Sequence, residues 1–266
     1  DQTQRTVSRL ARIQWRALSA EEKAIPSQEK FESALYALPS DHYAHLNGLI
    51  GELAEIAYKA VGRSETHAVE LAISAMTEVA CHYLCCRKNN LILTPTENPM
   101  VFGSDVHEVL IPVYEHLKDI NRNAVALKAE TTCTHVVREL GVIASYTATL
   151  KARDFRDHPA PITWMPLGYL KECVETAQRN GLDDVALEGS RFLLKVAQST
   201  PNNVQSGDVH FLAIEGWYKI SLTFLTAGKG PLANKVLEDM MTLAHHLLKQ
   251  KHFQLVEIFQ YILEKL

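Results

Sequence analysis

The spacing of apolar residues constrains the fold of this chain more than any other feature. From Leu46 onward apolar residues recur at intervals of three and four, and no segment sustains the alternating pattern of a half-buried strand beyond a few residues. The first such series ends at Gly62, with Ser40 as its expected N-cap, and comprises Leu46, Leu49, Ile50, Leu53, Ile56 and Ala60. The sequence therefore predicts an all-α protein.

The expected helices come in pairs. Ser64 is predicted to begin a second helix two residues after the first, and so short a turn indicates antiparallel neighbours. Another pair would run from Ser104 to about Asp119, turn at residues 121–123, and continue as a long helix. A third pair would run from about Pro166 to Asn180, stop at Gly181, and continue through 185–196. Helices over 208–227, 231–250 and 252–266 are expected to complete the chain, with Pro231 in a first turn.

A five-residue pattern of apolar, Ala, apolar, polar and small residues occurs four times in these helices. Its starts are 54, 60 and 27 residues apart, at 71–75, 125–129, 185–189 and 212–216. On a helix the second and fifth positions share a face, where small side chains let a neighbouring helix approach closely. We interpret the first three copies as the openings of second helices in hairpins, and the fourth as part of a first helix. The alternative is that Ala-rich amphipathic helices produce this loosely defined pattern through their composition alone.

The recurring hairpins resemble HEAT or armadillo-type α-solenoids over residues 41–250. The resemblance is architectural: spacings of 54 and 60 exceed the usual repeat length of about 40–47 residues, and no Asp/Arg ladder is visible. It implies stacked antiparallel hairpins forming an α-solenoid or irregular helical-repeat domain, and we transfer no functional residue from those families. We expect a basic amphipathic helix and a short helix over 1–39 and the helical-repeat domain over 40–266.

The charge balance limits the possible partners. The chain has 27 basic and 31 acidic residues, a net charge of −4, which argues against a dedicated nucleic-acid binder. Five cysteines in a chain of 266 residues favour reduced thiols and a cytoplasmic location. No run of about 18 apolar residues is present that could cross a membrane. The first residue is Asp1, which suggests a fragment of a larger protein that could carry a membrane anchor upstream.

Basic residues at the N-terminus follow helical spacing and form one stripe: Arg5, Arg9, Arg12 and Arg16. Apolar residues form the opposite stripe of the same segment: Val7, Leu10, Ala11 and Leu18. A basic amphipathic helix of this kind can lie on an anionic membrane surface or bind an acidic partner. It can equally pack its apolar stripe on the domain and leave its arginines in solvent.

The densest group of potential metal ligands is Cys81, His82, Cys85 and Cys86. Two thiolates at i and i+4 could supply part of a zinc site, but the sequence lacks Cys-x2-Cys spacing and a second ligand pair. We therefore predict no metal and no cofactor, and interpret these cysteines as packing residues or a reactive thiol. Cys133 and Cys173 lie on apolar faces and are predicted to be core residues.

These observations favour a non-enzymatic interaction or scaffold module that binds a protein or peptide through a groove or a loop edge. Long connections at 89–103, 151–164 and 200–207 would emerge along one edge of the stack and form that candidate site. No catalytic motif is present, so we predict no enzyme and assign no catalytic residue. One alternative is the cytoplasmic regulatory or sensing domain of a membrane-anchored protein, and the other is a helical enzyme or ligand sensor that uses Cys81, His82 and Cys85.

Overall fold

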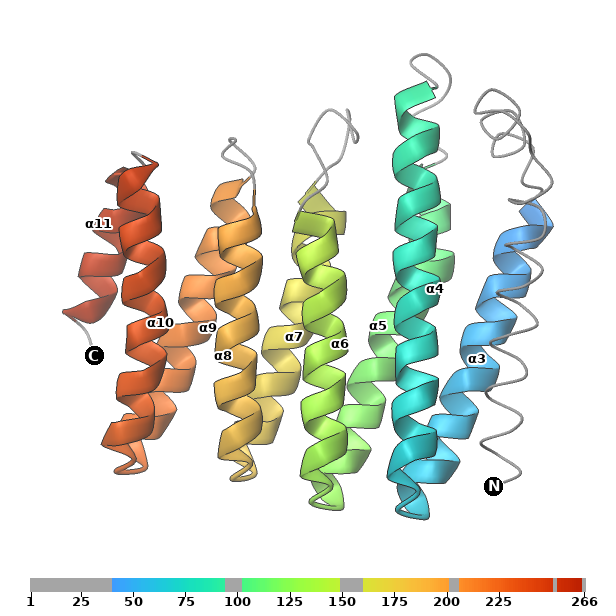
Figure 1. The fold of residues 1–266 in the computed structure, drawn as a ribbon, viewed down its shortest axis with the longest axis horizontal. Helices are drawn as coiled ribbons and strands as arrows, with labels where there is room; N and C mark the ends of the chain where they lie inside the picture. Colours follow the sequence, from blue (N-terminus) through green and yellow to red (C-terminus); the bar gives the residue numbers. More distant parts are fainter. Residues whose placement is uncertain (1–39, 94–101, 149–159, 201–205, 251–252, 265–266) are drawn as a thin grey trace. The chain divides into compact units, whose positions relative to one another are not determined.

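The computed structural model describes residues 40–93, 102–148, 160–200, 206–250 and 253–264, and all regular structure in these ranges is α-helical (Figure 1). The all-α prediction is confirmed. The described helices are α3 (Ser40–Gly62), α4 (Thr66–Leu93), α5 (Phe102–Ala126), α6 (Glu130–Ala148), α7 (Ala160–Arg179), α8 (Asp183–Ser199), α9 (Ser206–Thr226), α10 (Gly230–Lys249) and α11 (Phe253–Leu263). The chain divides into two compact units, one up to Ile120 and the other from Asn121.

The first unit contains the hairpin of α3 and α4. Apolar residues at helical spacing bury one face of each helix, as predicted; Ile50, Leu53, Ile73 and Met76 are fully buried. Tyr58 on α3 reaches α5, where its hydroxyl lies 3.1 Å from His116 Nδ1. Side-chain packing and this polar contact therefore both hold the unit together.

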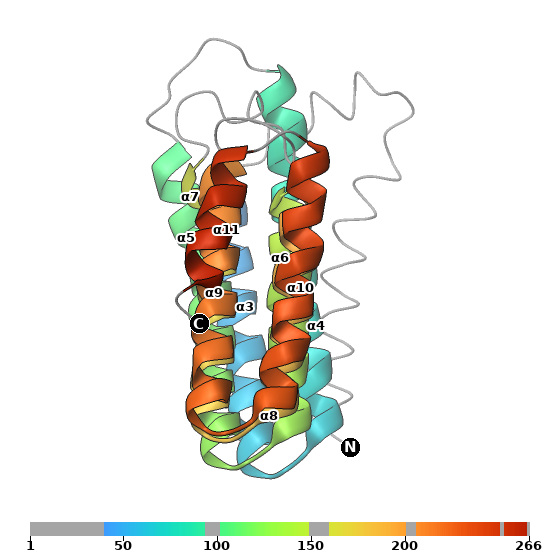
Figure 2. The same ribbon diagram turned by 90° about the vertical axis from the view of Figure 1, so that its left-hand side faces the viewer.

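The second unit has two layers of helices. α6, α8 and α10 lie side by side in one layer, and α7, α9 and α11 form the other (Figure 2). Trp217 on α9 is the largest buried side chain between the layers. Its indole N–H donates to the carbonyl and hydroxyl oxygens of Ser190 on α8, at 3.2 and 3.1 Å. The hydroxyl of Ser190 in turn donates to Asp239 on α10, at 2.5 Å.

Four hairpin turns share one geometry. Each has a residue with a left-handed backbone, at φ 58° for Ser64, 56° for Lys128, 80° for Gly181 and 71° for Gly228. In each, the next N–H bonds the carbonyl five residues back; the donors and acceptors are Glu65 to Ala60, Ala129 to Ala124, Leu182 to Ala177 and Lys229 to Phe224. This is the Schellman motif, which caps a helix by a left-handed residue. The turn residues are 64, 53 and 47 positions apart.

Buried positions repeat at fixed distances from these turn residues. Eleven residues before them stand Leu53, Leu117, Leu170 and Trp217, and sixteen residues after them stand Ala80, Ala144, Ala197 and Ala244. All eight side chains are buried. The hairpins are thus equivalent position by position when they are aligned on their turns, which we call the turn alignment.

Several predicted boundaries were wrong. Ser64 does not begin a helix but is the left-handed residue of its turn. α5 continues through residues 121–123, which were predicted as a turn, because the Asn121 side chain is buried and donates to the Cys173 carbonyl. α7 begins at Ala160, so Pro166 lies inside the helix instead of at its start.

The five-residue pattern does not mark equivalent positions. Its second copy, 125–129, crosses the end of α5 and the turn, so it does not open a second helix. The close approach predicted from its small residues does occur at two other copies. A Cβ at Gly189 would overlap Val174 on α7, and one at Gly216 would lie 2.8 Å from Leu193 Cδ1 on α8. The small residues therefore serve helix packing at different heights of the stack.

Candidate interaction surface

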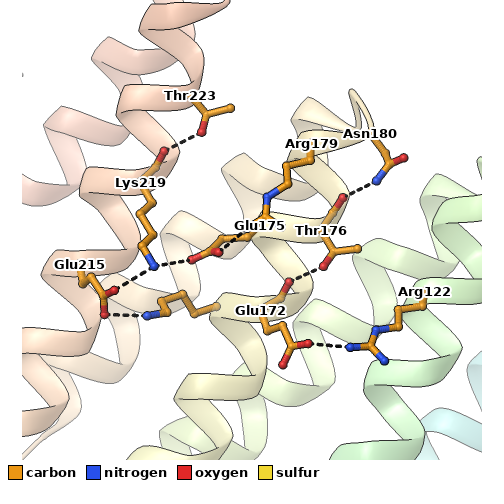
Figure 3. Close-up of polar contacts among 10 residues, drawn as sticks. Arg122, Glu172, Glu175, Thr176, Arg179, Asn180, Glu215, Lys219 and Thr223 are labelled. Carbon is orange, nitrogen blue, oxygen red and sulfur yellow. Dashed lines mark hydrogen bonds and ion pairs between the residues drawn. The ribbon is translucent and has the colours of Figure 1, made fainter.

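A chain of ion pairs connects α7 to α9 (Figure 3). Lys171 Nζ lies 2.6 Å from Glu215, and Lys219 Nζ lies 2.9 Å from Glu215 and 3.4 Å from Glu175. Glu175 also pairs with Arg179 at 3.0 Å on its own helix. We call these five residues the ion-pair ladder. Each of its charges has an opposite charge within 4 Å, so the ladder joins neighbouring helices.

The ladder shifts the titration of its own members. The hydrogen bond that Lys171 donates lowers the pKa of Glu215, and the hydrogen bond that Lys219 donates to Glu215 raises the pKa of Lys219. A similar pair, Arg122 and Glu172 at 2.9 Å, links α5 to α7. This surface is therefore compensated in charge and stabilises the layer.

The other layer carries a less balanced surface. Arg138 on α6 lies 3.7 Å from Glu188 on α8, and Arg191 on α8 lies 3.3 Å from the same carboxylate. Both arginine side chains are largely exposed, at 52% and 70%. One carboxylate is thus shared between two guanidinium groups.

The turn alignment shows where an Arg–Glu pair between neighbouring helices is replaced by two cations. Arg138 stands ten residues after its turn residue and Glu188 seven after its own, and these positions meet between α6 and α8. Between α8 and α10 the corresponding positions are Arg191 and Lys235, two cations. Lys195 lies one turn further along α8 with its Nζ 5.8 Å from the centre of the Phe192 ring, and both lysines are exposed. We call Arg191, Lys195 and Lys235 the basic patch.

A cationic surface of this kind suits carboxylate or phosphate groups. Arginine presents a planar fork that matches a carboxylate in two parallel hydrogen bonds, and lysine adds a flexible point charge. Because the three side chains come from two neighbouring helices of one unit, a rigid scaffold holds their backbones. The patch is therefore a candidate surface for an anionic segment.

The sequence did not single out these three residues. They lie on two helices, and no local motif joins them: Lys235 is 40 positions from Lys195 and 44 from Arg191. The signal that finds them is the turn alignment, which places an Arg–Glu pair on one pair of helices and an Arg–Lys pair on the next. Aligning the hairpins on the five-residue pattern instead does not place Arg191 and Lys235 at the positions of Arg138 and Glu188.

The predicted N-terminal site lies outside the described residues. Arg5, Arg9, Arg12 and Arg16 belong to 1–39, so their association with a partner or membrane stays a prediction. The greater part of the predicted loop edge also falls outside, at 94–101, 149–159 and 201–205. Within the part of the chain that the structure describes, no helix has the length and apolar character needed to cross a membrane.

The described cysteines Cys81, Cys133 and Cys173 are reduced thiols. Cys133 and Cys173 are buried as predicted, and burial raises the pKa of Cys133 to about 12, so that it stays protonated. Cys81 is partly buried. The side chains of His82, Cys85 and Cys86 are outside the described set, and among the described residues no group of His, Cys, Asp and Glu could hold a metal ion.

Tyr58 and His116 in the first unit form a half-buried pair. Burial raises the pKa of Tyr58 to about 12 and lowers the pKa of His116. The phenol oxygen and the imidazole nitrogen are within hydrogen-bond distance, with the donor set by the tautomer of His116, and the rings meet edge to face with centroids 6.0 Å apart. This contact ties α3 to α5 and needs no ligand.

No family model, no curated protein and no solved structure matches the chain.

Proposed function

We propose that this chain is a non-enzymatic protein-interaction module, built from helical hairpins, that binds an acidic segment of a protein partner. The observation that carries the proposal is the basic patch, where Arg191 and Lys235 occupy positions that hold an Arg–Glu pair one hairpin earlier. An acidic peptide would supply the missing carboxylates.

The equivalence of the four hairpins supports this proposal. Stacked helical hairpins, as in the HEAT and armadillo proteins that the sequence resembles, expose equivalent helix faces side by side and use them as extended binding surfaces. α6, α8 and α10 form such a row in the second unit. A partner segment lying across this row would meet Arg138, Arg191, Lys195 and Lys235 in turn.

We place the module in the cytoplasm. The buried thiols of Cys133 and Cys173 are compatible with a reducing compartment.

Because the basic patch is exposed, its attraction for a partner depends on the salt concentration. The patch contributes to the association rate and to specificity.

The direct test is the binding of a fluorescent Glu-rich peptide to the intact chain, measured by anisotropy. Lys195→Glu together with Lys235→Glu should weaken binding about tenfold. Each exposed charge contributes about 0.2–1 kcal/mol to the binding free energy, and charge reversal adds repulsion. Lys59→Glu with Arg63→Glu, two exposed cations of the first unit, is the matched control with the same change in net charge.

Equal weakening by both double variants would show attraction to net charge alone and would contradict the proposal. Binding to vesicles with anionic lipid but no binding to the peptide would favour the alternative of a membrane-associated regulatory domain.

A further inference from the structure

One face of α10 carries an apolar seam in which Met241 and Leu248 are exposed, Leu237 is half-buried and Ala244 is buried. Its residues Leu237, Met241, Ala244 and Leu248 follow the spacing i, i+4, i+7, i+11 of a coiled-coil seam. Met241 is 55% exposed and Leu248 is 44% exposed. Two large apolar side chains on one helix face are thus in contact with water.

The equivalent positions on α4 and α6 are covered. In the turn alignment they are Ile73, Thr77, Ala80 and Leu84 on α4, and Val137, Gly141, Ala144 and Ala148 on α6, all of which are buried. The close contact of Gly141 with Phe192 shows that on α6 this face meets the next helix of its layer, α8. The seam on α10 is therefore shaped to receive another helix.

The described helix that follows lies in the other layer. α11 contacts α9 and α10, and its 11 residues span about 16 Å, against about 31 Å for the 21 residues of α9. It leaves Met241 and Leu248 of the seam exposed, and it leaves Leu222 and Leu225, near the turn end of α9, each 38% exposed.

We propose that the seam binds the same seam of a second copy of this chain, with the two α10 helices antiparallel about a twofold axis. In this register Met241 packs against Ala244 of the second copy, and Leu237 packs against Leu248 of the second copy. A large side chain then faces a small one at the centre, and the two leucines fill the layers outside it.

The polar residues that flank the seam fit this arrangement. Glu238 and His245 are exposed, seven positions apart on the same side of the seam. The antiparallel register places Glu238 opposite His245 of the second copy, and twofold symmetry makes the contact twice. In a parallel arrangement this side of one helix would face the opposite side of its partner, so Glu238 and His245 would not meet.

The same twofold axis would also cover the exposed leucines near the turn end of α9. α11 begins at the end of α10 remote from the turn, and the antiparallel copy brings its α11 to the turn end. There it would approach Leu222 and Leu225, which α11 of the first copy does not cover.

Sedimentation velocity of the intact chain over a wide concentration range tests the proposal. The wild type should reach twice the chain mass of 29.8 kDa. Met241→Glu should weaken the dimer at least about tenfold, because a carboxylate would be buried among apolar side chains. Leu127→Glu, at a site 57% exposed in the turn between α5 and α6, should leave the dimer unchanged.

A charge exchange tests the register. Glu238→Lys should weaken the dimer, and the double variant Glu238→Lys with His245→Glu should restore it. A wild type that stays monomeric at every concentration, an equal effect of Met241→Glu and Leu127→Glu, or a double variant as weak as the single one would overturn the proposal.

Discussion

Gly189 on α8 lies so close to Val174 on α7 that a methyl group at Gly189 would overlap the Val174 side chain. The two helices belong to one hairpin, and the glycine sets their separation in the middle of the buried interface. A side chain at this position must push the helices apart or displace Val174.

We expect Gly189→Ala to lower the free energy of unfolding by about 1–3 kcal/mol, since both helices would have to move. Urea unfolding followed by circular dichroism measures this change. Gly168→Ala on α7, where a Cβ meets nothing within 4 Å, is the control and should be neutral or stabilise by up to about 1 kcal/mol. Equal effects of the two substitutions would contradict the close packing.

The turn geometry gives a second prediction. Ser64→Gly should raise the free energy of unfolding by about 0.5–1 kcal/mol, because glycine adopts a left-handed backbone without the steric cost of a Cβ. Gly181→Ala should lower it by about 1–2 kcal/mol for the same reason. Thermal unfolding of the two variants measures both changes, and a shift in the same direction for both would contradict the left-handed assignment.

The ion-pair ladder makes stability depend on pH. Lys171 holds the pKa of Glu215 below its ordinary value of 4.5, so the ionised pair stabilises the fold above that pH and the stabilisation is lost as the pH falls through the folded-state pKa. Glu215→Gln should therefore cost about 1 kcal/mol at neutral pH, with the difference from wild type shrinking below pH 4.5.

Urea unfolding at neutral and acidic pH measures that difference. Glu55→Gln, which removes an exposed pair with Lys59, is the control and should change stability by less than about 0.5 kcal/mol. A cost for Glu215→Gln that stays constant into strong acid would exclude the proposed electrostatic cause.

Ser190 is the centre of the polar contacts between α8, α9 and α10. Ser190→Ala should cost about 1–3 kcal/mol, because Asp239 loses its hydroxyl donor and Trp217 loses one of its two acceptors. Burial raises the pKa of Asp239 above its ordinary value of 3.8. The free energy of unfolding therefore falls as the pH rises from that value through the folded-state pKa, because the buried carboxyl group must ionise. Asp239→Asn should therefore cost less than Ser190→Ala at neutral pH, and the reverse order in urea unfolding would refute this account.

The helical character and the pairing of helices could be predicted from the sequence because both depend on local spacing. Boundaries failed where tertiary contacts decided the outcome. Three polar residues at 121–123 suggested a turn, yet Asn121 is buried and bonds the carbonyl of Cys173 on another helix. No local pattern reveals that partner.

The basic patch was missed for a related reason. Local sequence patterns indicate only residues that are close along the chain. Arg191 and Lys235 are far apart in the sequence, and two hairpin turns bring them to neighbouring helices. The left-handed residues of the first two turns, Ser64 and Lys128, are not glycines. Glycine is the usual sequence signal for such a turn, so the sequence did not show where to align the hairpins.

The most direct test of the acidic-partner proposal is the acetylation rate of individual lysines, measured by mass spectrometry with and without a saturating Glu-rich peptide. Lys195 and Lys235 should be protected several-fold by the peptide, while the exposed Lys59 of the first unit should react at an unchanged rate. Equal protection of all three lysines, or protection of none, would contradict the proposal that the basic patch binds an acidic segment.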